Sequence, residues 1–201
     1  MKRIFIYFFL IFLSGLSIPC SADEAQDCGL IIKVEKGDNG KKLIKSVFSI
    51  KADPEHVYQT LKNVKMFSEF MPGAADVEIL EKGSNYQVVK FSGSRGLFSA
   101  DIVMRRTIND SDKRIDWRLI DGPPKEICGF WHVERDKQRE SMAIVQYTNY
   151  VDAGALIPEF LVRKYLREDI KRMVPNIIKR VESLGTWLSD DYLKKISQKD
   201  K

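Results

Sequence analysis

Residues 160–184 read FLVRKYLREDIKRMVPNIIKRVESL, and this stretch decides the fold because its apolar side chains recur every three or four residues. Such spacing places them along one side of an α-helix, so the stretch predicts one long helix with a broad apolar face. Pro175 falls inside this helix and is expected to bend it, because its ring displaces the carbonyl of Lys171. The main apolar stripe consists of Val162, Leu166, Ile170, Met173, Ile177, Val181 and Leu184.

The chain from residue 75 to residue 152 alternates apolar and polar side chains with a period of two. This period predicts half-buried strands. Short turns rich in Gly, Asn, Asp and Pro separate the strands, and parallel pairing would need long crossovers. Successive strands are therefore expected to pair antiparallel, as a meander. The predicted strands are residues 77–81, 86–91, 97–108, 115–120, 127–135 and 142–151.

Two further strands, residues 30–35 and 43–50, and two short helices are predicted before the meander. The first helix begins at Asp53-Pro54-Glu55, where Asp53 can cap free N–H groups and Pro54 has the backbone angle of a first helical residue. The second spans residues 66–70. The predicted fold class is α+β: a curved antiparallel sheet against a long C-terminal helix, with two short helices after the first strands. Where such a sheet curves away from the helix, a pocket remains between them.

The first 22 residues, MKRIFIYFFLIFLSGLSIPCSA, have the layout of a secretory signal peptide. Lys2 and Arg3 precede an apolar run over residues 4–13, and small residues stand before Asp23. A retained membrane anchor is the alternative, but the run is short of the roughly 20 residues that span a bilayer. We expect cleavage after Ala22 and export, to the periplasm of a bacterium. The expected segments are a signal peptide (1–22), an N-terminal extension with a short strand (23–42), a ligand-binding domain (43–188) and a frayed polar tail (189–201).

Cleavage would leave two of the three cysteines, Cys28 and Cys128. A pair of cysteines in an exported chain is a candidate disulfide, because the compartment is oxidising. Two buried free thiols are the alternative, since sequence does not show the geometry that a disulfide needs.

The polar residues argue against several classes of chemistry. His56 and His132 are the two histidines and are expected on the surface, and no Gly-x-Ser-x-Gly elbow is present. The histidines and cysteines lack the spacing of a metal site, and no phosphate-binding loop or dinucleotide fingerprint occurs. We therefore expect no metal and no cofactor. A net charge of +5, spread along the chain, gives no reason to expect nucleic acid.

Asp101 and Asp116 fall within predicted strands, where acidic residues are depleted. We interpret both as members of cross-strand ion pairs on the outer face of the sheet. Arg105 and Arg118 are the expected partners of Asp101.

Large apolar and aromatic side chains are better represented than catalytic groups. Core packing accounts for most of them, but some are expected to line a cavity for an apolar ligand, with methionine as an adaptable wall. The predicted cavity residues are Phe91, Phe98, Ile102, Met104, Trp117, Trp131, Tyr147, Phe160, Leu161 and Met173.

The polar side of the long helix is rich in basic residues, interspersed with Glu159, Glu168, Asp169 and Glu182. A solvated face with Glu168–Arg172 pairing is one interpretation. Transient contact with anionic lipid headgroups is the other. The basic residues are Arg163, Lys164, Arg167, Lys171, Arg172, Lys179 and Arg180.

Several motifs occur in the order found in one superfamily. Residues 46–58, SVFSIKADPEHVY, combine a strand with an "A-x-P-E-x-V-(W/Y)" helix start, and residues 67–72 approximate "F-x-x-F-x-P". Ile115-Asp-Trp117, Gly129-Phe-Trp131 and Val145-Gln-Tyr147 follow on later strands, and Ile157-Pro-Glu-Phe-Leu161 opens the last helix. Over about residues 43–184 the chain thus resembles the START-like, helix-grip superfamily, which includes polyketide cyclases and coenzyme-Q-binding proteins.

The resemblance implies a deep cavity between the sheet and the closing helix, holding a hydrophobic molecule such as a lipid, a quinone or a polyketide. The first hypothesis is an exported, non-enzymatic carrier or sensor of such a ligand. One alternative is a cyclase- or hydrolase-type enzyme that uses Tyr147 or Asp116 as acid or base. Another is a module that docks on a membrane or a protein through the basic helix. The identity of the ligand and the oligomeric state stay open.

Overall fold

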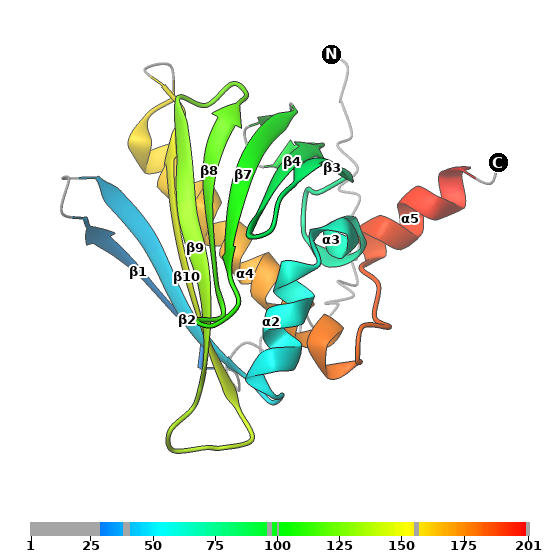
Figure 1. Cartoon of the computed structure of the whole chain (residues 1–201). Coiled ribbons are helices and arrows are strands. Elements are labelled where there is room, and N and C mark those ends of the chain that lie inside the picture. The colour runs from blue at the N-terminus through cyan, green and yellow to red at the C-terminus, as the bar shows by residue number, and fades with distance from the viewer. Residues whose placement is uncertain (1–28, 38–40, 96–97, 100, 155–156, 200–201) are drawn as a thin grey trace, which may run out of the picture.

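Eight strands form one antiparallel sheet in the order β1-β2-β10-β9-β8-β7-β4-β3 (Figure 1). The computed structural model describes residues 29–37, 41–95, 98–99, 101–154 and 157–199. From β3 to β10 the strands of this sheet lie in chain order, so the predicted meander is confirmed. The strands are β1 Ile31–Lys36, β2 Lys42–Ile50, β3 Asp76–Lys82, β4 Tyr86–Ser92, β7 Ile102–Asn109, β8 Arg114–Asp121, β9 Glu126–Arg135 and β10 Ala143–Asp152.

The long helix α4 crosses one face of this curved sheet; α2 lies beside its lower part, and α3 and α5 lie on the side of the β3 edge (Figure 1). The predicted α+β class, with a sheet wrapped around a long C-terminal helix, is confirmed. The helices are α2 Pro54–Lys62, η1 Val64–Met66, α3 Phe67–Phe70, α4 Glu159–Glu182 and α5 Asp190–Lys199. None of the helices among the described residues is both long and apolar enough to cross a membrane.

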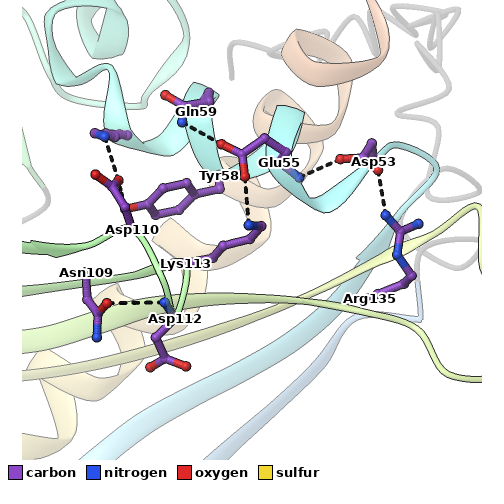
Figure 2. A network of polar contacts seen from close by, with 10 residues as sticks. Asp53, Glu55, Tyr58, Gln59, Asn109, Asp110, Asp112, Lys113 and Arg135 are labelled. Carbon is purple, nitrogen blue, oxygen red and sulfur yellow. Dashed lines mark hydrogen bonds and ion pairs between the residues drawn. The ribbon is translucent and has the colours of Figure 1, made fainter.

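Helix α2 begins as its sequence predicts. The Asp53 carboxylate accepts a hydrogen bond from the backbone N–H of Glu55 at 2.8 Å, and Pro54 is the first helical residue. The other Asp53 oxygen accepts from Arg135 at 2.6 Å, which ties the helix start to the end of β9 (Figure 2). A cap of this kind satisfies an N–H group that the helix itself leaves without a partner.

The turn between β7 and β8 is joined to α2 by a second set of polar contacts (Figure 2). The Tyr58 hydroxyl and the Lys62 ammonium both donate to the Asp110 carboxylate, at 2.8 and 2.6 Å, and Lys113 lies 2.7 Å from Glu55. Burial and the Asp110 carboxylate together raise the pKa of Tyr58 well above its usual value. This network fixes α2 against the sheet at the end of the molecule where β7 finishes.

The core lies where α4 and α2 cover the inner face of the sheet. Side chains of α4 meet apolar side chains from β2, β9, β10 and α2. Buried residues of this core include Ile44, Phe48, Ile50, Val57, Leu61, Val133, Val145, Ile170, Val174, Ile177 and Val181.

The predicted strand over residues 97–108 is broken into separate pieces. Phe91 of β4 pairs with Ile102 of β7, where the pairing of these two strands ends, and Ser92 still pairs with Asp76 of β3. Ser94–Arg95 (β5) and Phe98–Ser99 (β6) form a small hairpin of their own.

The C-terminal end also differs from the sequence-based expectation. Leu184, expected in the apolar stripe, is 78% exposed, because the helix ends at Glu182 and Leu184 and Gly185 adopt positive φ angles. The Gly185 N–H donates to the Arg180 carbonyl, as in a common helix-ending motif. Residues after Ser189, expected to fray, form helix α5, and the Ser189 N–H donates to the Glu69 carbonyl at 2.9 Å.

Candidate functional site

A cavity of about 120 Å³ lies between the inner face of the sheet and α4. A single water needs about 10–15 Å³ measured in the same way, so the space is large enough for an organic molecule. Most of its lining is apolar, as in small-molecule sites generally. The lining residues are Phe67, Met71, Ala74, Phe91, Ile102, Met104, Arg106, Trp117, Pro124, Ile127, Trp131, Tyr147, Asn149, Val151, Val162, Tyr165, Leu166, Asp169 and Met173.

The cavity has an open end and a closed end, which differ in the exposure of their lining residues. The strand register shows which residues lie at each end. Ile102 begins β7, and Ile127 pairs with Val151 where β9 begins and β10 ends. Tyr165 lies at this end and is 40% exposed. Further along the strands Met104, Trp131, Tyr147 and Met173 are buried, so the cavity closes toward Trp131 and Met173.

Three aromatic side chains form the wall near the closed end. The Tyr147 ring lies 4.3 Å from the ring of Trp131 and 5.6 Å from that of Trp117, measured between centroids. Trp117 and Tyr147 are stacked with 29° between their planes. The indole N–H of Trp117 donates to the Asn149 side-chain oxygen at 3.3 Å, which fixes the orientation of the ring.

Gly129 explains how Trp117 fits against the sheet. It lies directly opposite Trp117 in the β8–β9 pairing. A Cβ atom at Gly129 would come 2.6 Å from the Trp117 ring and 2.1 Å from the Thr148 carbonyl oxygen. Only a residue without a side chain leaves room for the indole in this position.

Polar groups enter the lining at Arg106, Asn149 and Asp169. Arg106 is 3% exposed, and its guanidinium donates to the carbonyls of Leu61 and Lys62 and to the Gln87 side-chain oxygen. Burial lowers the pKa of Arg106 to about 10. Asp169, on α4, accepts from Arg172 at 2.6 Å. The cavity is therefore apolar over most of its wall, with a buried cation at one point.

The structure places most of the ten predicted cavity residues around this space. They are Phe91, Ile102, Met104, Trp117, Trp131, Tyr147 and Met173. Phe160 is 61% exposed and Leu161 is half-buried outside the lining. Val162 and Leu166 face the cavity, and each residue turns a helix by about 100°, so Phe160 and Leu161 point elsewhere. Phe98 lies in β6, and its side chain is outside the described part of the structure.

Sequence reasoning missed several residues on the wall. Phe67 and Met71, from α3 and the segment after it, close the cavity beside Phe91. Arg106 was not singled out, although it follows Arg105 directly, and consecutive strand residues point to opposite faces. One of the two arginines therefore had to point inward. That alternation was the available signal.

Asp101, just before β7, and Asp116, on β8, both form ion pairs, but the partner of Asp101 is not an expected one and the pair of Asp116 is not cross-strand. Asp101 lies 2.7 Å from Lys90, rather than near Arg105 or Arg118. Asp116 pairs with Arg114 two residues away on the same strand, at 2.7 Å, and it does not line the cavity. The position of Asp116 removes one of the two residues considered for acid–base chemistry inside the cavity.

The histidines and Cys128 lie away from the cavity wall. His56 is half-buried, with its ring nitrogen 3.1 Å from the Val181 carbonyl, and His132 is 3.6 Å from Asp112. Among the described residues no group of three or more His, Cys, Asp and Glu side chains is placed to hold a metal ion. Cys128 is half-buried and burial raises its pKa, whereas Cys28 lies outside the described residues. The disulfide therefore stays a prediction.

More of the basic side chains of α4 form ion pairs than the sequence suggests, and fewer of them are exposed. Arg163 pairs with Glu159, Lys171 with Glu168, and Arg172 with Asp169 instead of Glu168. Arg180, expected on the solvated face, is 2% exposed.

Arg180 is buried because it joins three parts of the chain. Its guanidinium donates to the Glu69 carboxylate at 2.5 Å and to the Trp187 carbonyl at 2.6 Å. It therefore links α4, α3 and the segment that leads into α5.

The fold and its enclosed apolar cavity define a protein of the hydrophobic-ligand-binding, helix-grip class. The chain belongs to the family described as polyketide cyclase / dehydrase and lipid transport, whose model matches residues 50–178. No curated protein sequence gives a significant match.

Solved structures share the fold at low sequence identity. A STAR-related lipid transfer protein from Xanthomonas axonopodis has 18% identity and a TM-score of 0.61, over 77% of this chain and 94% of that one. The Zhui aromatase/cyclase from a Streptomyces species has 19% identity and a TM-score of 0.57, over the same shares of the two chains. Human StAR-related lipid transfer protein 5 has 12% identity and a TM-score of 0.58, over 77% of this chain and 87% of that one.

Proposed function

We propose that this protein is an exported carrier or sensor that holds a lipid-like molecule in the cavity between its sheet and α4. The observation that carries the proposal is the enclosed cavity itself, walled by Trp117, Trp131, Tyr147 and Met173. Methionine and aromatic side chains accommodate apolar ligands of varied shape. Two of the structural neighbours are called lipid transfer proteins, which supports a ligand of this class.

The enzymatic alternative has less support in the geometry. Tyr147 lines the cavity, but Asp116 lies outside it, paired with Arg114. A general acid or base has to reach the reacting atoms, so Asp116 is not placed for that role. We therefore favour binding without chemical conversion.

Binding is tested by titrating a fluorescent fatty probe into protein from which bound lipid has been extracted. Saturable binding with a stoichiometry of one supports the carrier. Absence of binding for fatty, quinone and polyketide probes alike would contradict it. A turnover product appearing during the titration would instead favour the enzyme.

Export is part of the proposal and rests on the sequence of residues 1–22. Its test is N-terminal sequencing of the protein from the periplasmic fraction of an expressing bacterium. A mature chain beginning at Asp23 is the expected result, and a full-length chain in the cytoplasm would contradict export. Mass measurement of the same sample without reduction detects or excludes a bond between Cys28 and Cys128.

A carrier also has to collect its ligand, and we propose that the open end of the cavity touches anionic membranes transiently. Phe160 and Tyr165 are exposed on the first turns of α4, and the exposed Lys164 and Arg167 lie on the same turns. Exposed aromatic and basic side chains together favour a membrane surface. Flotation with vesicles that contain anionic lipid is the test, and equal recovery with neutral vesicles would contradict a headgroup interaction.

A further inference from the structure

Arg106 is a buried cation without an acidic partner among the described residues. Its guanidinium makes three hydrogen bonds, all to neutral oxygens: the Leu61 carbonyl at 2.7 Å, the Gln87 side chain at 2.9 Å and the Lys62 carbonyl at 3.2 Å. An arginine has five N–H donors and keeps its charge inside a protein. The site therefore retains both positive charge and donor capacity.

Arg180 provides an internal comparison for this arrangement. It is as deeply buried as Arg106, at 2% against 3% exposure, but Glu69 supplies a carboxylate to it at 2.5 Å. Burying a charge without a counter-charge is costly, and proteins usually place an opposite charge beside it. Around Arg106 the described residues provide the carbonyl end of α2, which carries a partial negative charge, the Gln87 side-chain oxygen and the face of the Phe67 ring, but no carboxylate in an ion pair.

Arg106 lies in the wall of the cavity at its inner part. It pairs with Trp117 across β7 and β8, and its guanidinium carbon is 5.5 Å from the centre of the Phe67 ring. Ile102, at the open end, is four residues earlier on the same strand, a distance of about 13 Å along β7. A molecule that enters beside Ile102 can therefore bring its leading end to Arg106.

We propose that the ligand is an amphiphile whose anionic end, a carboxylate or a group of similar size, binds Arg106 while its apolar body extends toward Tyr165. This inference rests on the proposed function and names the chemical class of its ligand. Asp169 is the other charged residue of the lining, and the Arg172 guanidinium, at 2.6 Å, offsets its charge from the helix surface. The cation at Arg106 is thus the group in the wall that is best placed to select an anion.

Three probes with the same twelve-carbon chain test the proposal: dodecanoate, its methyl ester and 1-dodecanol. Each displaces a fluorescent reporter from extracted wild-type protein at pH 8, below its micelle concentration. We expect dodecanoate to bind at least about tenfold more tightly than either neutral probe, because a hydrogen bond between two charged groups is stronger than one to a neutral group. Equal affinities, or tighter binding of the ester or the alcohol, would overturn the proposal.

Arg106→Met should reduce the preference for dodecanoate to within about twofold while the alcohol still binds. Arg105→Met is the matched control, since Arg105 points to the other face of β7 and stacks on Tyr86 at 3.8 Å. It should keep the wild-type preference. A preference that survives in Arg106→Met would overturn the role of Arg106.

Because Arg106 also holds the last carbonyls of α2, circular dichroism must show that Arg106→Met is folded. If it is not, Arg106→Lys keeps the positive charge at this position. A retained preference for dodecanoate in this variant supports the anchor, and loss of the preference in a folded Arg106→Lys protein counts against it. The wild-type comparison decides the main point in either case. Wild-type protein that binds none of the three probes or the reporter contradicts the proposed function itself, whereas equal binding of all three contradicts only the anionic anchor.

Discussion

Gly129 and Trp117 face each other across β8 and β9, and the indole of Trp117 occupies the space that a side chain at Gly129 would need. Trp117 in turn stacks on Tyr147 and donates to Asn149. One glycine therefore determines how the aromatic wall of the cavity is placed. Trp117 belongs to the short motif Ile115-Asp-Trp117, and Gly129 belongs to Gly129-Phe-Trp131. The close packing of the two residues explains why one motif contains a tryptophan and the other a glycine.

Gly129→Ala should destabilise the protein by about 1–3 kcal/mol, because its Cβ would overlap the Trp117 ring and the Thr148 carbonyl. Urea denaturation measures the loss in the free energy of unfolding, and tryptophan fluorescence reports the displacement of the ring. Glu134→Ala, at an exposed position of the same strand, is the control and should change the free energy by less than about 0.5 kcal/mol. If Gly129→Ala had the stability and fluorescence of the wild type, the aromatic wall would tolerate the added Cβ atom.

Leu166→Trp should fill the cavity from the α4 side and weaken binding of a fluorescent fatty probe by at least about tenfold. Leu166 is half-buried and lines the cavity, so a larger side chain has space to enter it. Arg167→Trp adds the same side chain at the next, exposed position and should leave binding within about twofold. If both variants bind like the wild type, the ligand lies elsewhere.

Arg180→Met should destabilise the protein by about 3–5 kcal/mol, since it leaves the Glu69 carboxylate without its counter-charge beside the core. It also removes the hydrogen bond to the Trp187 carbonyl that holds the segment leading into α5. Lys171→Ala removes an exposed ion pair with Glu168 and should change the free energy of unfolding by less than about 0.5 kcal/mol. Similar effects of the two substitutions in urea denaturation would contradict this ranking.

The stability of the fold should fall in acid, and part of the loss should come from Asp110. The Lys62 ammonium and the Tyr58 hydroxyl hold the pKa of this carboxyl below its ordinary value of 3.8. A lowered pKa in the folded state stabilises the protein above about pH 4, and this contribution is lost as the pH falls through the folded-state value. Asp110→Asn should therefore lose less free energy of unfolding than the wild type between pH 6 and pH 3.

Urea denaturation at several pH values makes this comparison. Asp191→Asn, at an exposed position of α5, should follow the wild-type curve. The same acid dependence in Asp110→Asn and in the wild type would show that Asp110 contributes nothing to it.

The secondary structure could be predicted because local signals and tertiary packing agree over most of the chain. The stripe from Val162 to Val181 and the cap at Asp53 specify α4 and the start of α2 with little ambiguity. The prediction was wrong where the decisive contact is distant in sequence. The helix after Ser189 packs against α3 through residues that no local pattern links to it. Leu184 is a different case, because it leaves the stripe at a local turn where Leu184 and Gly185 both have positive φ angles.

The candidate site was harder to predict than the fold for the same reason. Alternation along a strand identifies which side chains share a face, and it placed Trp117, Trp131 and Tyr147 on the cavity wall. It does not show how far a helix is rotated, so Phe160 and Leu161 were placed on the wrong side of α4. Alternation indicates that either Arg105 or Arg106 points inward, but it does not show how a buried arginine is satisfied: Leu61 and Gln87 bind Arg106, and Glu69 binds Arg180, all far from them in the chain.

Native mass spectrometry of the purified protein, before and after lipid extraction, tests the central claim most directly. The cavity between the sheet and α4 predicts a complex with one hydrophobic molecule of defined mass, which extraction removes and an added fatty acid restores. The Leu166→Trp variant should carry less of this molecule than Arg167→Trp. A spectrum that contains only the bare chain, and that stays unchanged when lipids, quinones or polyketides are added, would contradict the account.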